Sequence, residues 1–254
     1  MYTDVQFEEL EHEERILTEE AIILLLLALG VAQSEVKKEV YSFYQKYGKD
    51  GVVTYNDVRK WVSANNRQRR LTVLFGAISV SFGKLFTKLK PKMLSILVEI
   101  AQKETDFFDS KIDIDKVVST KWGVDDTTWD IRLKDDVDLW NIYVATDLKR
   151  AFMRRDNIDD VIKQINKRFT TMEHIIQKLA MTESTAVGSL ARREIFEALG
   201  IKKYRFYARE DERTCEICGS LHGLVFPVSS YEIGVNASPI HPWCRCWEVP
   251  ITNS

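Results

Sequence analysis

The sequence has few cysteines and little net charge, and it lacks a long hydrophobic run. All four cysteines lie within the last 40 of its 254 residues. This clustering excludes a disulfide-dense secreted scaffold and indicates one local cysteine site near the C-terminus. The 36 basic and 38 acidic residues nearly cancel, so the average charge predicts affinity neither for nucleic acid nor for a membrane.

The longest apolar run covers only 12 residues, at 21–32. A helix that crosses a bilayer needs about 20 apolar residues, so this run indicates a buried helix face. The segment before it is acidic, whereas a signal peptide begins with basic residues. The sequence therefore predicts no targeting or membrane-spanning segment, no membrane partner, and a chain made in the cytoplasm.

The charges are unevenly spread along the chain. Residues 1–30 hold eight acidic residues and one arginine, so the remainder has a positive balance. Such a chain could present an acidic arm to one partner and a basic face to another, although solvated helix faces are the alternative interpretation of each cluster. The basic clusters are Arg67, Arg69 and Arg70; Lys84, Lys88, Lys90 and Lys92; and Lys149, Arg150, Arg154 and Arg155.

Apolar residues at three- and four-residue steps predict helices over most of residues 5–110. Lys90-Pro91 predicts a break, followed by a helix over 92–107. Further helices are expected over 133–155, over 157–168 with Asn157 as its cap, and over 171–199 with Gly200 at its end. The polar stretch 109–130 reads as a connection between two lobes.

Short strands are predicted near the C-terminus, over 203–209, 224–228 and 246–251. The fold class expected is α+β, a mainly helical body with a small C-terminal β-rich zinc-knuckle lobe. We expect two domains, an N-terminal helical region over 1–130 and a second domain over 131–254 whose terminal lobe covers about 203–254. Trp243, Trp247 and Tyr231 are expected either to cover a very small core or to form a docking surface.

One constellation of residues points to metal binding. Cys215 and Cys218 form a C-x-x-C pair, and Cys244-x-Cys246 follows after 25 residues, with His241 three residues before Cys244. Soft thiolates and an imidazole in this pattern are typical of a tetrahedral structural zinc site. A disulfide pair or buried thiols are the alternative, disfavoured in a reducing compartment. Bound zinc contributes on the order of 10 kcal/mol, which a lobe with so small a core needs.

Five groups compete for four ligand positions at this site. Cys215 and Cys218 are the first pair, and two of His241, Cys244 and Cys246 complete the shell as Cys₄ or Cys₃His. In an extended segment Cys244 and Cys246 point to the same face, which favours both sulfurs. His241 then lies beside the ligands or replaces one of them, and His222 is expected at the rim.

No catalytic motif accompanies these residues. The sequence contains no P-loop, no H-E-x-x-H and no G-x-S-x-G, and no spacing indicates a nucleophile–base pair. A closed shell of four protein ligands leaves no position for water, so it indicates a structural role and no enzyme.

A set of motifs over about residues 140–250 resembles one known family. They are a helix carrying Thr182-Glu183, the aromatic strand at Tyr204–Tyr207, D-x-R-T-C-x-x-C ending at Cys218, the step Leu221-His222-Gly223, and P-x-H-P-x-C-R-C ending at Cys246. The segment resembles the tailed-phage minor head proteins, a phage head morphogenesis family that is phage Mu minor-head-like. Met181, His222 and Trp243 differ from the residues usual in the family, which are arginine, aspartate and a small polar residue.

The resemblance implies a structural virion component that joins the head with the portal during assembly. The expected partners are the portal protein and other capsid or scaffold components, and the location is the head interior or the portal vertex. An alternative is a DNA-contacting protein that is packaged in the head and ejected with the genome. A zinc-knuckle nuclease is a distant third, because it needs further ligands for a second metal and the chain has only four histidines.

Overall fold

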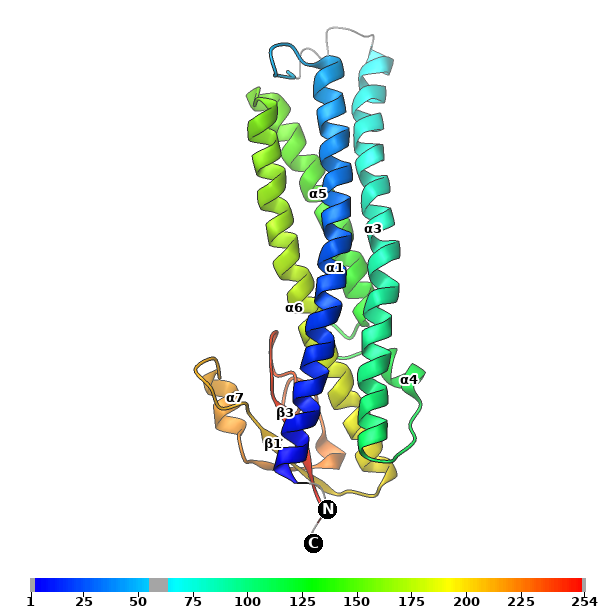
Figure 1. Cartoon of the computed structure of the whole chain (residues 1–254), viewed down its shortest axis with the longest axis vertical. Coiled ribbons are helices and arrows are strands. Elements are labelled where there is room, and N and C mark those ends of the chain that lie inside the picture. Colours follow the sequence, from blue (N-terminus) through cyan, green and yellow to red (C-terminus); the bar gives the residue numbers. More distant parts are fainter. Residues whose placement is uncertain (1–2, 55–63, 253–254) are drawn as a thin grey trace. The chain divides into compact units, whose positions relative to one another are not determined.

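Long helices make up most of the computed structural model, which describes residues 3–54 and 64–252 (Figure 1). In these residues the long helices are α1 Asp4–Tyr47, α3 Ala64–Phe107, α5 Trp129–Arg154 and α6 Ile158–Ala198. The short elements are α4 Ile114–Val118, β1 Lys203–Tyr207, α7 Glu216–Leu221, β2 Val225–Pro227, the 3₁₀ turn η1 Val228–Ser230 and β3 Trp247–Ile251. The predicted α+β class, a mainly helical body with a small C-terminal sheet, is confirmed.

Internal contacts divide the chain into two compact units. Unit 1 comprises the described residues up to 23, residues 91–131, and those from 177 onward; unit 2 comprises the described parts of 24–90 together with 132–176. Each unit therefore takes segments from both sides of residue 130. The division into domains 1–130 and 131–254, with a lobe over 203–254, stays a prediction.

Unit 2 is built from segments of the four long helices. In α1 the buried residues recur at three- and four-residue steps, as the amphipathic pattern requires. Aromatic pairs join neighbouring helices, with ring centroids 5.5 Å apart for Phe43 and Phe152 and 6.1 Å apart for Phe82 and Phe169. Arg168 of α6 also pairs with Asp147 of α5 at 2.7 Å. Unit 2 therefore has an ordinary apolar core.

Helix α3 runs through Pro91, where the sequence predicted a break. Proline lacks the N–H for the helical hydrogen bond and costs about 3 kcal/mol inside a helix. The turns on both sides bury large side chains almost completely, each worth about 1.5–3 kcal/mol; they are Leu85, Leu89, Met93 and Leu97. Their burial outweighs the lost hydrogen bond, so the prediction of a break was wrong.

Helix α6 is also continuous, whereas the sequence predicted two helices separated near residue 170. Thr170 and Thr171 donate hydrogen bonds to the carbonyls of Asn166 and Lys167, at 3.3 and 3.2 Å, so their hydroxyls do not compete with the helix. Phe169 and Met172 are buried. The predicted ends are confirmed: Asn157 accepts from the Asp160 N–H at 2.9 Å, and Gly200 has φ +70°.

In unit 1 the three strands form an antiparallel sheet in the order β2-β1-β3. Buried Tyr204 and Phe206 alternate with exposed Lys203 and Arg205 along β1. The predicted strands are confirmed to within a few residues. The sheet residues share one core with side chains from α1 and α6, among them Phe7, Ile195 and Phe196.

The three aromatic residues of the lobe have two different environments. Tyr231 and Trp247 are buried in the core of unit 1, whereas Trp243 is 44% exposed. The core interpretation therefore holds for two of them, and only Trp243 is available to a partner.

Helices α1 and α3 each contain an 18-residue window that is apolar enough to cross a membrane, within Val5–Tyr47 and Arg70–Phe107. About a third of each window is buried inside the protein, 33% and 28%. The exposed apolar residues of α1 include Ile23, Leu24, Leu27 and Val31. Core helices of soluble proteins pass the same test of length and composition, so the absence of a membrane segment stays a prediction.

We predict that Pro91→Ala stabilises the protein by about 1–2 kcal/mol. Alanine restores the missing helical hydrogen bond, and the greater freedom of the unfolded chain offsets part of that gain. Urea unfolding followed by far-UV circular dichroism measures the change. Glu99→Ala, at an exposed position of the same helix, should change stability by no more than about 0.5 kcal/mol. A Pro91→Ala protein less stable than the wild type would contradict the explanation given for α3.

Candidate metal centre

The C-x-x-C pair sits at the start of α7. Cys215 is the N-cap of this helix and has extended backbone angles, φ −76° and ψ 160°. Its sulfur accepts a hydrogen bond from the Cys218 N–H at 3.4 Å, as a capping side chain does. This turn brings the two sulfurs to the same side of the chain.

Helix α6 holds the second ligand segment in place. Thr182 Oγ1 accepts from the Trp243 N–H at 3.2 Å and donates to the Lys178 carbonyl at 2.7 Å. One turn later, Thr185 Oγ1 donates to the Cys244 carbonyl at 3.2 Å. Trp243 has φ +67°, in the left-handed region. The Thr-Glu motif of the sequence therefore has a physical role, since its threonine fixes the turn between His241 and Cys244.

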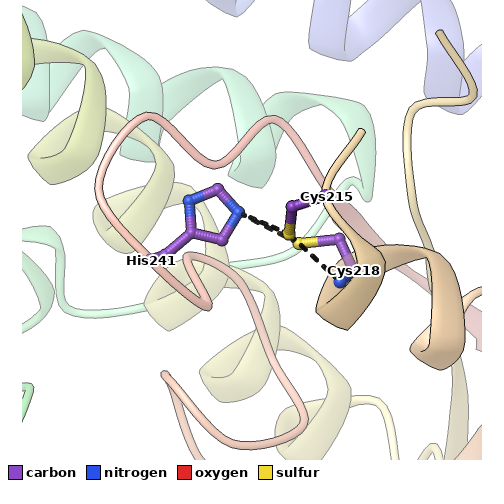
Figure 2. Close-up of side chains that lie close together, drawn as sticks. All are labelled: Cys215, Cys218 and His241. Carbon is purple, nitrogen blue, oxygen red and sulfur yellow. Dashed lines mark hydrogen bonds between the residues drawn. The ribbon is translucent and has the colours of Figure 1, made fainter. Parts of the chain in front are cut away.

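The imidazole of His241 points at the sulfurs of the first pair (Figure 2). Its Nε2 lies 3.2 Å from Cys215 Sγ and 3.3 Å from Cys218 Sγ. The other ring nitrogen, Nδ1, lies 2.7 Å from the Pro242 carbonyl oxygen. A carbonyl can only accept, so Nδ1 carries the proton and Nε2 offers its lone pair toward the sulfurs, as a metal-binding histidine does.

Cys244 and Cys246 lie close to Cys218. The sulfurs of Cys218 and Cys244 are 3.8 Å apart, and all four cysteines are free thiols. A disulfide requires about 2.05 Å between sulfurs. Two thiolates bound to one tetrahedral zinc at about 2.3 Å lie about 3.8 Å apart. The spacing therefore fits ligands of one metal ion, and no disulfide is present.

The five predicted groups form two overlapping triads that could hold a metal ion. Cys215, Cys218 and His241 make one triad, and Cys218, Cys244 and Cys246 make the other; ligand atoms within each lie within 4.8 Å of one another. Cys218 belongs to both. Its position makes it the residue on which a single shared site depends, while the choice among His241, Cys244 and Cys246 stays open. His222 belongs to neither triad and accepts from the Ala208 N–H at 3.2 Å.

The three thiols of the second triad differ in their pKa. Hydrogen bonds from the thiols of Cys218 and Cys246 lower the pKa of Cys244 to about 2. The same contacts raise the pKa of Cys218 and of Cys246, and burial raises both further. These contacts favour the thiolate form at Cys244 over the other two, and a positive ion is what would allow the others to ionise.

A second polar cluster in unit 1 was not predicted. Arg192 of α6 is surrounded by Glu11 and Glu14 of α1, Glu104 of α3 and Glu248 of β3. Two of these acids belong to the N-terminal stretch that the sequence interpreted as an arm for a partner; Glu14 is buried and Glu11 is half-buried. Their spacing from Phe7, Leu10 and Thr18 places them on the buried side of the helix. Counting the acidic residues of this stretch does not show which of them face the core.

Residues 143–249 match the family model described as Phage Mu protein F like protein. This segment of the chain is phage Mu F-like. Over these residues the match confirms the resemblance that the motifs indicated. The match begins within α5 and ends within β3, so it includes all five residues of the candidate metal centre. Neither the search of curated proteins nor that of solved structures returned a match.

We predict that Thr182→Val destabilises the protein by about 1–3 kcal/mol. Valine has nearly the shape of threonine but cannot accept from the Trp243 N–H, which then loses its partner in a half-buried position. Thermal unfolding followed by tryptophan fluorescence measures the loss. Thr170→Val is the matched control, since that hydroxyl bonds only within its own helix. Equal melting of the two variants would show that the Thr182 contact does not hold the ligand segment.

Proposed function

We propose that the chain is a minor head protein of a tailed phage and acts in head morphogenesis at or beside the portal. The family match over residues 143–249 carries this proposal, because it includes the candidate metal centre and the α6 segment that supports it. The partners proposed are the portal protein and other capsid or scaffold components, and the site of action is the virion.

We further propose that the metal is zinc and that its role is structural. Zinc prefers a shell of four thiolates, or of three thiolates and one imidazole. Cys218, Cys244 and Cys246 are each at most 4% exposed, so water has little access to an ion among them. A closed, buried shell stabilises a small lobe and does not provide the open position of a catalytic metal.

Contact with DNA finds less support in the basic clusters. Arg154 pairs with Asp156 at 2.6 Å, Lys84 lies 3.7 Å from Glu35, and the Arg70 guanidinium lies over the Tyr47 ring. The side chains of Arg67 and Arg69 lie outside the described residues. Part of the basic surface is therefore already paired within the protein itself. Ejection with DNA is kept only as an outcome of the test below.

An asymmetric reconstruction of heads assembled from the same phage's proteins tests the location. We expect density for the chain beside the portal ring in heads assembled with it, and none there in heads assembled without it. Antibody labelling of an epitope tag on the chain gives an independent readout. Density spread over the icosahedral shell, or a chain absent from purified heads, would contradict the proposal. Loss of the portal-side density after genome release would favour the ejected, DNA-contacting role instead.

Removing the shared thiolate tests the zinc proposal. We expect one zinc per chain in the purified protein, and loss of the metal in Cys218→Ser because this residue belongs to both triads. Zinc binding is worth on the order of 10 kcal/mol, so the terminal lobe should lose its fixed structure. Elemental analysis and the near-UV circular dichroism of the lobe's aromatic residues measure the two effects.

The control for this variant is Ser229→Ala, which removes an exposed hydroxyl from the same lobe. It should retain both the zinc and the near-UV spectrum. Zinc retained at full occupancy in Cys218→Ser, or no zinc in the wild-type protein, would refute a metal centre that depends on Cys218.

A further inference from the structure

The Arg192 cluster in unit 1 holds more negative than positive charge. Four carboxylates surround one guanidinium, and Arg192, Glu104, Glu248 and Glu14 are respectively 2%, 0%, 0% and 7% exposed. If all four acids are ionised, three negative charges are left without a counter-charge in a buried site. Buried charges of this kind require paired cations or bound protons.

Only one of these carboxylates is fully supplied with hydrogen bonds. Glu248 accepts from Ser189 Oγ and Tyr231 OH, both at 2.9 Å, and from the Ser238 N–H at 2.6 Å. By contrast, Glu14 Oε1 and Glu104 Oε2 have no hydrogen-bond partner among the described residues other than the contact that these two acids make with each other. Arg192 contacts the other oxygen of each of these two acids. One oxygen of each therefore remains for a further ligand.

A cavity of about 40 Å³ lies beside this cluster; Arg192, which contacts Glu104, lines it, whereas Glu104 itself does not. Glu11, Glu14 and Ser184 line it, and the Ser184 hydroxyl, which is 5% exposed, also has no hydrogen-bond partner among the described residues. A single water needs about 10–15 Å³ of cavity volume, so the space admits an ion with a few waters. The cavity thus joins free volume to oxygen atoms that lack a partner.

Besides Arg192, three basic side chains line the cavity, and each has a carboxylate partner outside the cluster. Arg15 lies 3.3 Å from Glu19, and Arg245 makes two hydrogen bonds with Asp211, at 2.5 and 2.6 Å. Arg209 also faces Asp211, at 3.9 Å. Because Arg209 and Arg245 share the single charge of Asp211, they offset at most one of the three unbalanced negative charges of the cluster.

The spacing of the acids fits one metal ion. Glu11, Glu14 and Glu104 each offer a carboxylate oxygen, and these oxygens lie within 4.8 Å of one another. Oxygens on opposite sides of a calcium ion, at about 2.4 Å each, are about 4.8 Å apart. We propose that Glu11, Glu14 and Glu104 bind one hard divalent cation in this cavity, with waters and the Ser184 hydroxyl completing its coordination. Its ligands are not those of the cysteine centre, although Cys244 also lines the cavity, and the site does not depend on the proposed head function.

Protons are the competing occupant. Burial raises the pKa of Glu11 to about 7 and also raises the pKa of Glu14 and of Glu104. A folded-state pKa above the unfolded value contributes stability at low pH that is lost as the pH rises through the folded pKa. Without a cation, the protein should therefore lose stability between about pH 5 and pH 8. A bound cation favours the ionised acids and should reduce that loss.

Calcium titration of the full-length protein tests the site, with its cysteine centre loaded with zinc. We expect one calcium per chain by isothermal titration calorimetry at about pH 8, together with a higher melting temperature. The rise should shrink toward about pH 5, where protons occupy the acids. Glu14→Gln and Glu104→Gln should each weaken calcium binding at least about tenfold. Glu99→Gln, at an exposed position on α3, should leave it unchanged.

Two results would overturn the proposal. The first is wild-type protein that binds no calcium, magnesium or manganese up to about 10 mM, the weakest range of protein calcium sites, and melts at the same temperature with and without them. Protons then balance the cluster. The second is calcium binding that survives both glutamine substitutions, which places the ion elsewhere. The wild-type titration decides the first point even if a variant does not fold.

Discussion

The terminal lobe depends on the contact of two chain segments through Cys218. Its three strands are short, and the cluster next to the sheet consists largely of sulfur-bearing residues with Phe206 and Ala208. Apolar burial on this scale stabilises a lobe only weakly. The C-x-x-C turn and the segment from His241 to Cys246 therefore need a stronger connection, which the proposed metal ion, bound by their sulfurs and imidazole, would provide.

The need to hold separate chain segments together explains why α6 carries polar residues on a buried face. Thr182 and Thr185 hold the second ligand segment, and Arg192 on the same helix gathers the acids of α1, α3 and β3. Unit 1 is thus organised around one helix that positions a thiolate site and a carboxylate site. A rigid arrangement of this kind suits the proposed role in a head, where a small protein must keep its surface constant among larger partners.

The sequence predicts much of the cysteine centre because the ligand types and their spacing are local properties. It predicts the strands and the caps at Asn157 and Gly200 for the same reason. It fails at Pro91 and at Thr170-Thr171, where burial of neighbouring side chains decides the outcome. It also misses the Arg192 cluster, because Glu11, Glu104 and Glu248 are far apart in the chain and only the fold brings them together.

Zinc X-ray absorption spectroscopy of the purified full-length protein tests the central claim most directly. The account predicts a first shell of four ligands, with at least three sulfurs at about 2.3 Å and any nitrogen at about 2.0 Å. It predicts no bound water in that shell. A spectrum with only light ligands, or protein that contains no zinc and whose cysteines form disulfides, would contradict it.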